Sequence, residues 1–587
     1  MSMDEKELLK LLSSHEWKDI EFKEAQRSVP KNAYESVSAF ANTEGGHLVF
    51  GVRKDGSDFE VVGVLNVDKV QNDFLTSLRQ KDKISLIIDV KEHLHSVNEK
   101  DLLVFYVPEA SRTDKPVFLN GDIRRSFLRK GACDMKCSNE EVQRLISDAS
   151  MERYDGQTVD HDLSTCYSSK DIAWYRKQYE GKTSNRDYGD LDDLEFLFQL
   201  GLIKNTDRGQ KPTIASILLF GQDGYLRGLL PRPVIDCQRY LFKHDDYSRG
   251  ERWHDRTVCD YNLVQSWLAV LEWYYRFAEI PYEVNPKTLQ RSDTPPDYIA
   301  FREAIINMLI HQDYADHCRK PVIAHFTDLT RFWNPGDAFA NVRDLLEPGE
   351  KETRNPLLVT AFRRIGFSEN AGWGLLDVFN NWRGLGKVPP VINNDKSKKS
   401  FELVLHKEVL LSKAQVEFQK TIGVHLSEDE ASVFAYACKH KKLSIYDIRD
   451  VSGNPLQSCR DIADHLVIQA LLVKMDNDLY ELLPVMQERF KHVKAEAHDE
   501  AHDEAHEKIQ GDMTETERQI LNYCVEPKST PELLKLLGYS TRTGNYKSAL
   551  SSLLAGGYLE MTIPGSPRSR NQKYKSTLKG KLLVHND

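Results

Sequence analysis

The sequence predicts a multidomain protein of mixed α/β and α+β class. Its 587 residues suffice for several domains of ~100–200 residues each. Short apolar runs alternate with helical patterns over the first 410 residues, and two similar series of three helices and a strand pair follow. We expect six segments, with these bounds: 1–150, 151–290, 291–410, 411–490, a linker at 491–512, and 513–587.

Composition excludes several classes of protein. A hydrophobic fraction of 40% excludes a disordered chain, and 32 Gly with 22 Pro are too few for a fibrous one. No apolar run approaches the ~18 residues of a membrane span, and the acidic N-terminus is unlike a secretory signal. The 9 cysteines occur singly, as is typical of a reducing compartment. We therefore expect a cytoplasmic protein without membrane contact. Because the net charge is −10, any contact with nucleic acid requires local basic patches.

Residues 1–150 have the pattern of a compact α/β unit. Pro30 precedes a helical stretch that Gly45 and Gly46 end, and the apolar run HLVFGV is bounded by glycines, which predicts a buried strand. The expected helices are 5–12, 31–43 and 139–149, and the expected strands are 19–23, 47–52, 84–90, 102–107 and 123–128.

Residues 151–410 mix helices and strands. The apolar runs at 214–221 and 233–242 are predicted as strands, and the helix at 264–279 is apolar on all sides, which predicts burial. Further helices are expected at 297–312, 357–366 and 374–382, and a final strand at 400–406.

The last third repeats one architecture. Helices are predicted at 427–438, 444–451 and 455–469, followed by a hairpin at 470–483; the second series has helices at 514–524, 530–537 and 542–555 and strands at 558–564 and 572–577. This order predicts two winged helix-turn-helix modules. The tract AEAHDEAHDEAHEKI between them predicts a solvated spacer.

Two N-terminal stretches, EWKDIEFKEA and VSAFANTEGGHLVFGVRKDG, resemble the signature of the AlbA-like domain of the Schlafen family, over residues 13–148. In Schlafen nucleases, two glutamates five residues apart and an acid after the Gly-Val turn hold a divalent metal that cleaves RNA. The resemblance places these roles on Glu16, Glu21 and Asp55, with Mg²⁺ or Mn²⁺ as the metal. Lys54 stands where the family has its third acid.

The same residues allow a second interpretation. Bacterial members of this family are usually regarded as nucleic-acid-binding modules, and Glu16 and Glu21 are then solvent-facing acids beside Lys18 and Lys23. In that case phosphate is contacted by a late basic strand and turn, which contain Arg124, Arg125, Arg129 and Lys130. An ordinary solvated basic face is the alternative for these four residues.

The stretch FREAIINMLIHQDYADH at 301–317 places Glu303 and Asn307 one helical turn apart on one face. A glutamate can activate water while an asparagine oxygen binds Mg²⁺ at nucleotide phosphates. This helix resembles the N-box helix of the GHKL (Bergerat-fold) ATPases, and more closely the divergent form that accompanies the AlbA-like domain in bacterial RecG-related regulators. Without the resemblance, it is a helix face with two polar groups.

Three later motifs agree with that family in order and spacing: RFWNPGD at 331–337, TRNPLL at 353–358 and ENAGWGLLDVF at 369–379. The resemblance implies a GHKL-type α/β sandwich that binds ATP with Mg²⁺. Gln312 replaces an arginine of the family pattern, which favours binding over rapid turnover. The residues assigned to the nucleotide are Glu303, Asn307, His311, Asp313, Asn334, Gly336, Asp337, Arg354, Asn355, Gly372 and Gly374, with Glu303 in the catalytic role and Asn307 as the metal ligand.

The C-terminal module is basic within an acidic chain. Residues 514–587 contain 11 Lys and Arg against 6 Asp and Glu, a net charge of +5. This charge predicts contact with DNA through the third helix and the wing. The side chains expected at the groove include Arg542, Asn545, Lys547, Arg568, Arg570 and Lys573. A module for protein interaction or dimerisation is the alternative.

These observations predict an ATP-binding, nucleic-acid-binding regulator of bacterial type, acting in transcription or in defence against foreign DNA. ATP is expected to gate the engagement of nucleic acid. DNA is the expected ligand and RNA the alternative, and GHKL relatives suggest a homo-oligomer. The rival function is a Schlafen-like, metal-dependent nuclease regulated by ATP or a partner; a scaffold in which both sites are inactive is the third.

Overall fold

The structure, a computed structural model, describes residues 19–55, 58–150, 152–182, 188, 190–247, 252–279, 295–347, 349, 351–367, 374–475, 478–491, 514–539, 541, 543–555, 557–563 and 572–577. The chain divides into two compact units. The first comprises residues 1–410 and 449–454, and the second comprises 411–448 and 455–587. None of the described helices is long and apolar enough to cross a membrane.

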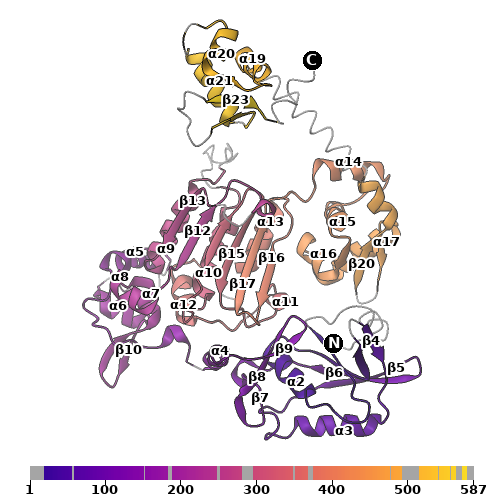
Figure 1. The fold of residues 1–587 in the computed structure, drawn as a ribbon. Helices are drawn as coiled ribbons and strands as arrows, with labels where there is room; N and C mark the ends of the chain where they lie inside the picture. Colours follow the sequence, from indigo (N-terminus) through magenta and orange to yellow (C-terminus); the bar gives the residue numbers. More distant parts are fainter. Residues whose placement is uncertain are drawn as a thin grey trace. The chain divides into compact units, whose positions relative to one another are not determined.

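The N-terminal part of the first unit is built on a four-stranded sheet of order β1-β2-β6-β5 (Figure 1). β1 pairs with β2 in parallel and the other pairs are antiparallel. Helices α2 and α3 pack on one face through Phe40 and Phe74, and the β3–β4 hairpin covers the other. The elements are β1 (Ile20–Lys23), α2 (Ala33–Asn42), β2 (Gly46–Phe50), β3 (Val52–Asp55), β4 (Asp58–Val61), α3 (Val67–Leu78), β5 (Lys91–Val97) and β6 (Lys100–Val107).

A second, smaller sheet and a helix complete this part. β7 (Phe118–Leu119), β8 (Asp122–Lys130) and β9 (Cys133–Lys136) pair in chain order, and α4 (Asn139–Ala149) packs against β8 through Val142 and Leu145. The strand expected at 84–90 is wrong: Ile84 forms only an isolated bridge with Leu119. Ile84 and Ile88 are buried in the core, so this apolar run fills space without joining a sheet. The helix expected at 5–12 lies outside the described residues.

The middle segment is more helical than the sequence indicated. It contains α5 (Ser169–Glu180), α6 (Asp193–Gln199), the hairpin β10 (Ile203–Thr206) and β11 (Gly209–Pro212), α7 (Ile214–Phe220) and α8 (Asp223–Leu229). The strand expected at 214–221 is therefore wrong, because α7 occupies this run. Every residue of α7 is buried, so the run has no polar face to reveal a helical period, and the Thr213 side chain caps its first turn.

The sheet that positions the candidate site has six strands in the order β13-β12-β14-β15-β17-β16. They are β12 (Ile235–Arg239), β13 (Asp255–Cys259), β14 (Val322–His325), β15 (Leu329–Pro335), β16 (Val391–Asp395) and β17 (Ser400–His406). Only β12 and β14 pair in parallel.

Helices cover one face of this sheet (Figure 1). They are α9 (Leu263–Tyr275), α10 (Tyr298–His311), α12 (Pro356–Arg364) and α13 (Gly374–Gly384); a short α11 (Val342–Leu345) precedes α12. Inward residues of alternate strand positions, such as Ile323, Phe332 and Leu403, join the helices in the largest core. The predicted helices and the final strand of this segment are confirmed within a few residues.

The second unit contains the same order of elements twice. The first copy, which α14 (Lys413–Thr421) precedes, has α15 (Glu428–His440), β18 (Lys442–Ser444), α16 (Ile445–Ser452), α17 (Leu456–Ile468), β19 (Leu472–Lys474) and β20 (Leu479–Leu482). The second has α19 (Glu515–Tyr523), β21 (Lys528–Ser529), α20 (Thr530–Leu536), α21 (Gly544–Ala555), β22 (Leu559–Met561) and β23 (Lys573–Ser576). Ser427 and Thr514 form equivalent capping boxes at the first helix of each copy.

Candidate functional site

A pocket of about 300 Å³ lies between α10, the end of β15 and the start of α13. Its walls bring together most of the residues predicted to bind nucleotide: Asn307, His311, Asn334, Gly336, Asp337, Arg354 and Gly374. One part of the lining is apolar, with Phe339, Leu345, Phe401 and Leu403. An apolar pocket with a few convergent polar groups is the usual form of a small-molecule site.

Glu303 and Asn307 meet the start of α13. Gly374 lies beside both side chains: a Cβ added there would be in ordinary van der Waals contact with Asn307 Nδ2 at 3.4 Å and with Glu303 Oε2 at 3.5 Å. Glu303 is buried and its carboxylate is paired with Arg302. Among the described residues, Asn307 Nδ2 is buried without a hydrogen-bond partner. Such a group costs about 1–3 kcal/mol until an acceptor reaches it. The geometry therefore suits a ligand rich in acceptor oxygens.

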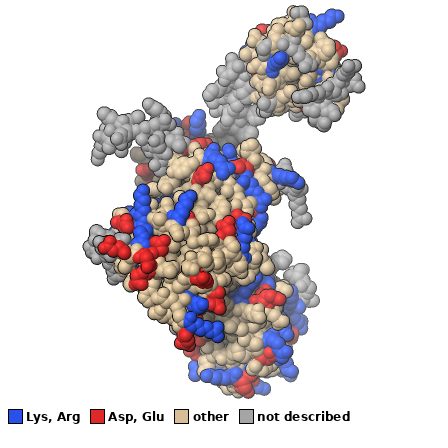
Figure 2. Space-filling view, turned by 90° about the vertical axis from the view of Figure 1, so that its left-hand side faces the viewer, with Lys and Arg blue, Asp and Glu red and all other residues tan. Residues whose placement is uncertain are grey.

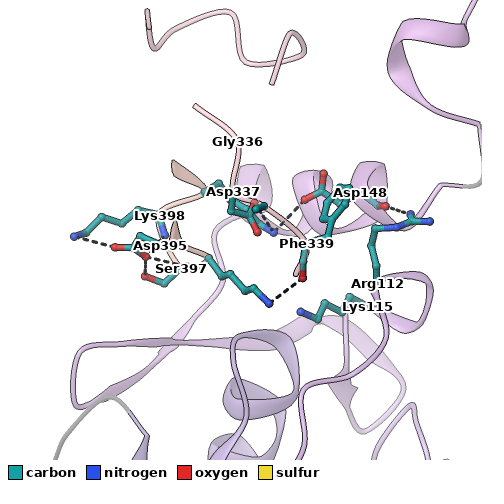
Figure 3. A network of polar contacts seen from close by, with 12 residues as sticks. Arg112, Lys115, Asp148, Gly336, Asp337, Phe339, Asp395, Ser397 and Lys398 are labelled. Carbon is teal, nitrogen blue, oxygen red and sulfur yellow. Dashed lines mark hydrogen bonds and ion pairs between the residues drawn. The ribbon is translucent and has the colours of Figure 1, made fainter. Parts of the chain in front are cut away.

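A buried ion-pair network reaches the pocket through Arg354 and Asp337, which line it (Figure 3). Arg354 donates to Asp337 Oδ1 over 3.1 Å and is paired with Asp148. Lys399 lies 3.1 Å from Asp148 and 3.5 Å from Asp337. Burial alone would raise the pKa of Asp148, but the charges of Arg354 and Lys399 outweigh it and lower this pKa to about 2. The network therefore stays ionised at neutral pH.

The turn after β15 requires glycine. Gly336 has φ +96°, and a Cβ there would lie 2.9 Å from Asp313 N and 3.1 Å from Arg354 Nε. Asn334 donates its amide to the carbonyls of Pro335 and Gly336, which shapes the same turn. The N-P-G motif therefore forms a turn at the pocket in which glycine keeps the space beside Arg354 free of a side chain.

His311 lines the pocket as a neutral imidazole. Burial, and then the nearby charge of Arg354, lower its pKa from 6.5 to about 4. The ring thus acts as a polar, uncharged group at neutral pH.

Glu303, Asp313 and Asn355, which are also assigned to the nucleotide, do not line the pocket. Asn355 is fully buried and donates to the carbonyls of Ile310 and Gln312, which holds the end of α10. Gln312 is also fully buried and accepts from Arg232. An arginine here would therefore not face phosphate directly. Asp313 donates its backbone N–H to Pro335 O and supports the glycine turn. Gly372 lies outside the described residues.

Sequence reasoning missed Phe339, Lys399 and Asp148. Phe339 lies close after the N-P-G motif, and its ring faces Arg354 at 4.7 Å. Lys399 lies at the β16–β17 turn and Asp148 at the end of α4, and neither has a local motif that marks it.

In the N-terminal part, Glu21 is engaged by two cations. Its Oε1 accepts from Lys23 over 2.6 Å and its Oε2 from Arg129 over 2.7 Å. Arg129 also donates to Asp134, and its side chain is only 1% exposed. The expectation that Arg129 contacts phosphate is therefore wrong, because its guanidinium is enclosed by these partners.

The three predicted nuclease acids are not described together. Glu16 and the side chain of Asp55 lie outside the described part of the chain, and Lys54 lies over the Phe59 ring at 5.8 Å. Within the described residues, no three His, Cys, Asp or Glu side chains form a metal-sized cluster. The metal site at these acids stays a prediction.

The remaining basic residues form a shallow groove. Arg124, Arg125 and Lys136 line it together with Phe127 and the acidic Glu35 and Asp122, and Lys130 does not line it. Arg124 is exposed and its guanidinium forms two hydrogen bonds with Asp122, whereas Lys130 is paired with Glu141 of α4. Elsewhere positive and negative side chains are interspersed on the face seen in Figure 2. Any contact of this domain with phosphate groups is therefore confined to the surface around Arg124 and Arg125.

The S-A-F-A-N-T stretch has a structural role. Asn42 donates to the carbonyls of Val117 and Phe127 and accepts from the N–H of Val117. Ser38 donates to Val117 O, and Thr43 accepts from the N–H of Arg129. These buried hydrogen bonds attach α2 to β7 and β8. The role of the motif is therefore structural.

In the C-terminal module, Asn545 and Lys547 are exposed on α21 and Lys573 is exposed on β23. Arg542, Arg568 and Arg570 lie outside the described residues.

Comparisons with known proteins show that four segments of the chain each match a protein family. Residues 16–138 match the Schlafen AlbA_2 family, and residues 319–405 match the C-terminal region of a putative ATP-dependent DNA helicase RecG. Residues 143–236 match a domain family of unknown function. Residues 518–577 match the C-terminal domain of the Fic-like protein (filamentation induced by cAMP).

Two solved structures show likeness. A Corynebacterium diphtheriae protein is 17% identical over 95% of both chains, with a TM-score of 0.37. The N-terminal domain of a putative ATP-dependent DNA helicase RecG-related protein from Nitrosomonas europaea is 32% identical, with a TM-score of 0.19; the match covers 24% of this chain and 95% of that one. No curated protein matches the chain.

The chain belongs to the multidomain proteins that join a Schlafen AlbA_2 domain to an ATPase-like domain of the RecG C-terminal type. Its domain composition is that of a nucleic-acid-associated, ATP-binding protein.

Proposed function

We propose that this protein is a regulator of bacterial type that binds nucleic acid under the control of ATP held in the pocket beside α10. The observation that supports it most is the convergence of the Asn307 amide, the Arg354 guanidinium and the open start of α13 on one apolar-walled pocket. The RecG-related family match and the AlbA_2 match favour DNA as the nucleic acid, with RNA as the alternative.

The pocket residues fit a magnesium nucleotide. Asn307 would bring Mg²⁺ to the phosphates, and the backbone at Gly374 would approach them without a side chain. Glu303 would position water for hydrolysis. Its pairing with Arg302 engages the carboxylate, which supports binding with slow turnover. The apolar wall around Phe339 would enclose the base, next to Asn334 and Asp337.

Several architectural expectations belong to the same proposal. Residues 291–410 form a divergent GHKL-type sandwich, and 411–490 and 513–587 form winged helices joined by the charged linker at 491–512. The second winged helix contacts DNA through the exposed Asn545, Lys547 and Lys573, together with Arg542, Arg568 and Arg570. The working form is a homo-oligomer that acts in transcription or in defence against foreign DNA.

A melting experiment tests the nucleotide site. A ligand at a hundredfold excess over its Kd stabilises the folded form by ~2.7 kcal/mol, so Mg²⁺ and ATP should raise the Tm of the parent. Asn307→Ala should abolish the shift, and Glu303→Gln should keep it while stopping hydrolysis. Asn393→Ala is the matched control, because Asn393 bonds Glu402 in the same sheet and lies outside the pocket lining. The absence of a shift in the parent at millimolar ATP would refute the nucleotide site.

A binding experiment tests the DNA contact. Neutralising Arg568, Arg570 and Lys573 should weaken duplex binding and reduce its dependence on salt, because each phosphate contact releases counterions. Lys474→Gln is the control in the first module, where Lys474 is paired with Asp464. If the triple variant binds duplex with the parent's affinity and salt slope, the wing does not contact DNA. Adding ATP in the same assay measures the proposed gating.

The nuclease alternative requires Glu21 to exchange Lys23 and Arg129 for a metal ion. It predicts that labelled RNA or single-stranded DNA is cut with Mg²⁺ or Mn²⁺, and that Glu21→Gln stops the cutting. If the substrates stay intact with and without ATP, the nuclease alternative is refuted and only the binding function remains.

A further inference from the structure

Helix α4, which closes the N-terminal domain, ends at the wall of the nucleotide pocket. Val142 and Leu145 attach it to that domain, and Arg112 donates to the carbonyls of Asp148 and Ser150 at its end. The backbone at Asp148 is therefore attached to the N-terminal domain by its own contacts.

Both carboxylate oxygens of Asp148 reach across to the pocket domain. Oδ1 accepts from Arg354 Nη1, and Oδ2 lies 3.1 Å from Lys399 Nζ. The side chains of Asp148, Arg354 and Lys399 are 12%, 10% and 12% exposed, so water screens these pairs weakly. Asp337 completes the cluster from the pocket side.

These partners orient the guanidinium of Arg354. Nη1 is directed to Asp148, Nη2 is directed to Asp337, and the plane lies near the Phe339 ring. Among the described residues, Nε is buried without a hydrogen-bond partner, and Arg354 lines the pocket. Gly336 leaves the space beside Nε free, because a Cβ there would be 3.1 Å away. An acceptor atom of a bound nucleotide would give this N–H group a hydrogen-bond partner.

We propose that Asp148 is a positioning residue of the nucleotide site: it holds Arg354 in the orientation that receives the nucleotide, so the N-terminal domain is a working part of that site. This inference rests on the proposed nucleotide function and adds a residue and a route of regulation to it. Asp148 acts through Arg354 and does not itself touch the nucleotide.

Two further ion pairs also connect the N-terminal domain with the pocket domain. Arg112 binds Glu352 over 2.6 Å, and Glu109 binds Lys396 over 2.7 Å. Glu352 lines the pocket, and Lys396 also donates to the carbonyl of Phe339, another lining residue (Figure 3). The segment 109–115 and the end of α4 thus contact the rim of the pocket together. Because coupling between binding free energies is reciprocal, nucleotide should in turn stabilise the attachment of the N-terminal domain.

The test compares full-length variants in calorimetric titration with Mg²⁺ and ATP. Asp148→Asn should weaken nucleotide affinity about tenfold, which is 1.4 kcal/mol. Arg144→Gln is the matched control: it lies one turn earlier on α4 and pairs with Asp316, which is outside the pocket lining. It should keep the parent's affinity within twofold. Asp148→Glu retains the charge and should recover most of the lost affinity.

Hydrogen exchange supplies a second readout that a merely structural residue would not change. Nucleotide should slow exchange in 109–115 and 139–149 in the parent and in Arg144→Gln, but not in Asp148→Asn. Parent affinity in Asp148→Asn, or an equal loss in Arg144→Gln, would overturn the inference while leaving the nucleotide function standing. A parent that binds no nucleotide would refute the proposed function itself, and this inference with it.

Discussion

Replacing Gly336 by alanine tests whether the turn after β15 is built for the pocket. The chain offers a matched control in Gly209, at the start of β11. The two glycines have almost the same backbone angle, φ +96° and φ +93°, but a Cβ at Gly209 would meet nothing within 4 Å. Gly209→Ala therefore carries the backbone strain alone, and Gly336→Ala carries the strain and the contacts.

The expected magnitudes follow from these distances. Backbone strain at such a φ costs about 1–3 kcal/mol at either site. At Gly336 the new methyl would also lie 2.9 Å from Asp313 N, a backbone atom, and 3.1 Å from Arg354 Nε. Overpacking of this kind costs a further ~1–3 kcal/mol, so we expect Gly336→Ala to lose about 2–6 kcal/mol.

Urea unfolding of the first unit and titration with Mg²⁺ and ATP measure the two effects. Gly209→Ala should lose only the ~1–3 kcal/mol of backbone strain and keep the parent's nucleotide affinity. Gly336→Ala should lose more stability and most of its affinity, because Arg354 is displaced. Equal loss of stability in the two variants would show that the contacts around Gly336 do not matter. Unchanged nucleotide affinity in a folded Gly336→Ala protein would refute the role of the turn.

Three further predictions concern buried charges. His311 has a pKa lowered to about 4 by burial and then by Arg354, so the unfolded chain binds the proton more tightly. Stability should be complete above pH 6.5 and fall by about 3 kcal/mol as the pH drops to 4, and His311→Gln should flatten that part of the Tm profile. Burial raises the pKa of Asp155 to about 6, so its ionisation opposes folding at higher pH. Asp155→Asn should therefore raise the Tm at pH 8, because Asn still accepts from the N–H groups of α12; a lower Tm would show that its charge stabilises the helix. Glu21→Gln should destabilise the N-terminal domain by about 3 kcal/mol in thermal unfolding, because it removes one partner of the buried Arg129; an unchanged Tm would show that Asp134 suffices.

Local pattern determined much of this protein. The helices predicted at 297–312, 357–366 and 374–382 coincide with α10, α12 and α13 within a few residues, and the strand predicted at 400–406 coincides with β17. Spacing alone placed Glu303 one turn from Asn307, and the resemblance to the GHKL family implied that the N-P-G turn and Gly374 belong to the same nucleotide site. The helices, the strand and the Glu303–Asn307 spacing are readable because each depends on residues a few positions apart.

Tertiary structure decided the rest. The run at 214–221 became a helix because complete burial removes the polar face that distinguishes a helix from a strand. Arg129 looks like a phosphate contact in the sequence, but the fold encloses it with Glu21, 108 positions away. Asp148 and Arg354 are separated by 206 positions, and no local signal relates them. Their pairing exists only because the N-terminal domain packs on the pocket, where low exposure strengthens the attraction between opposite charges.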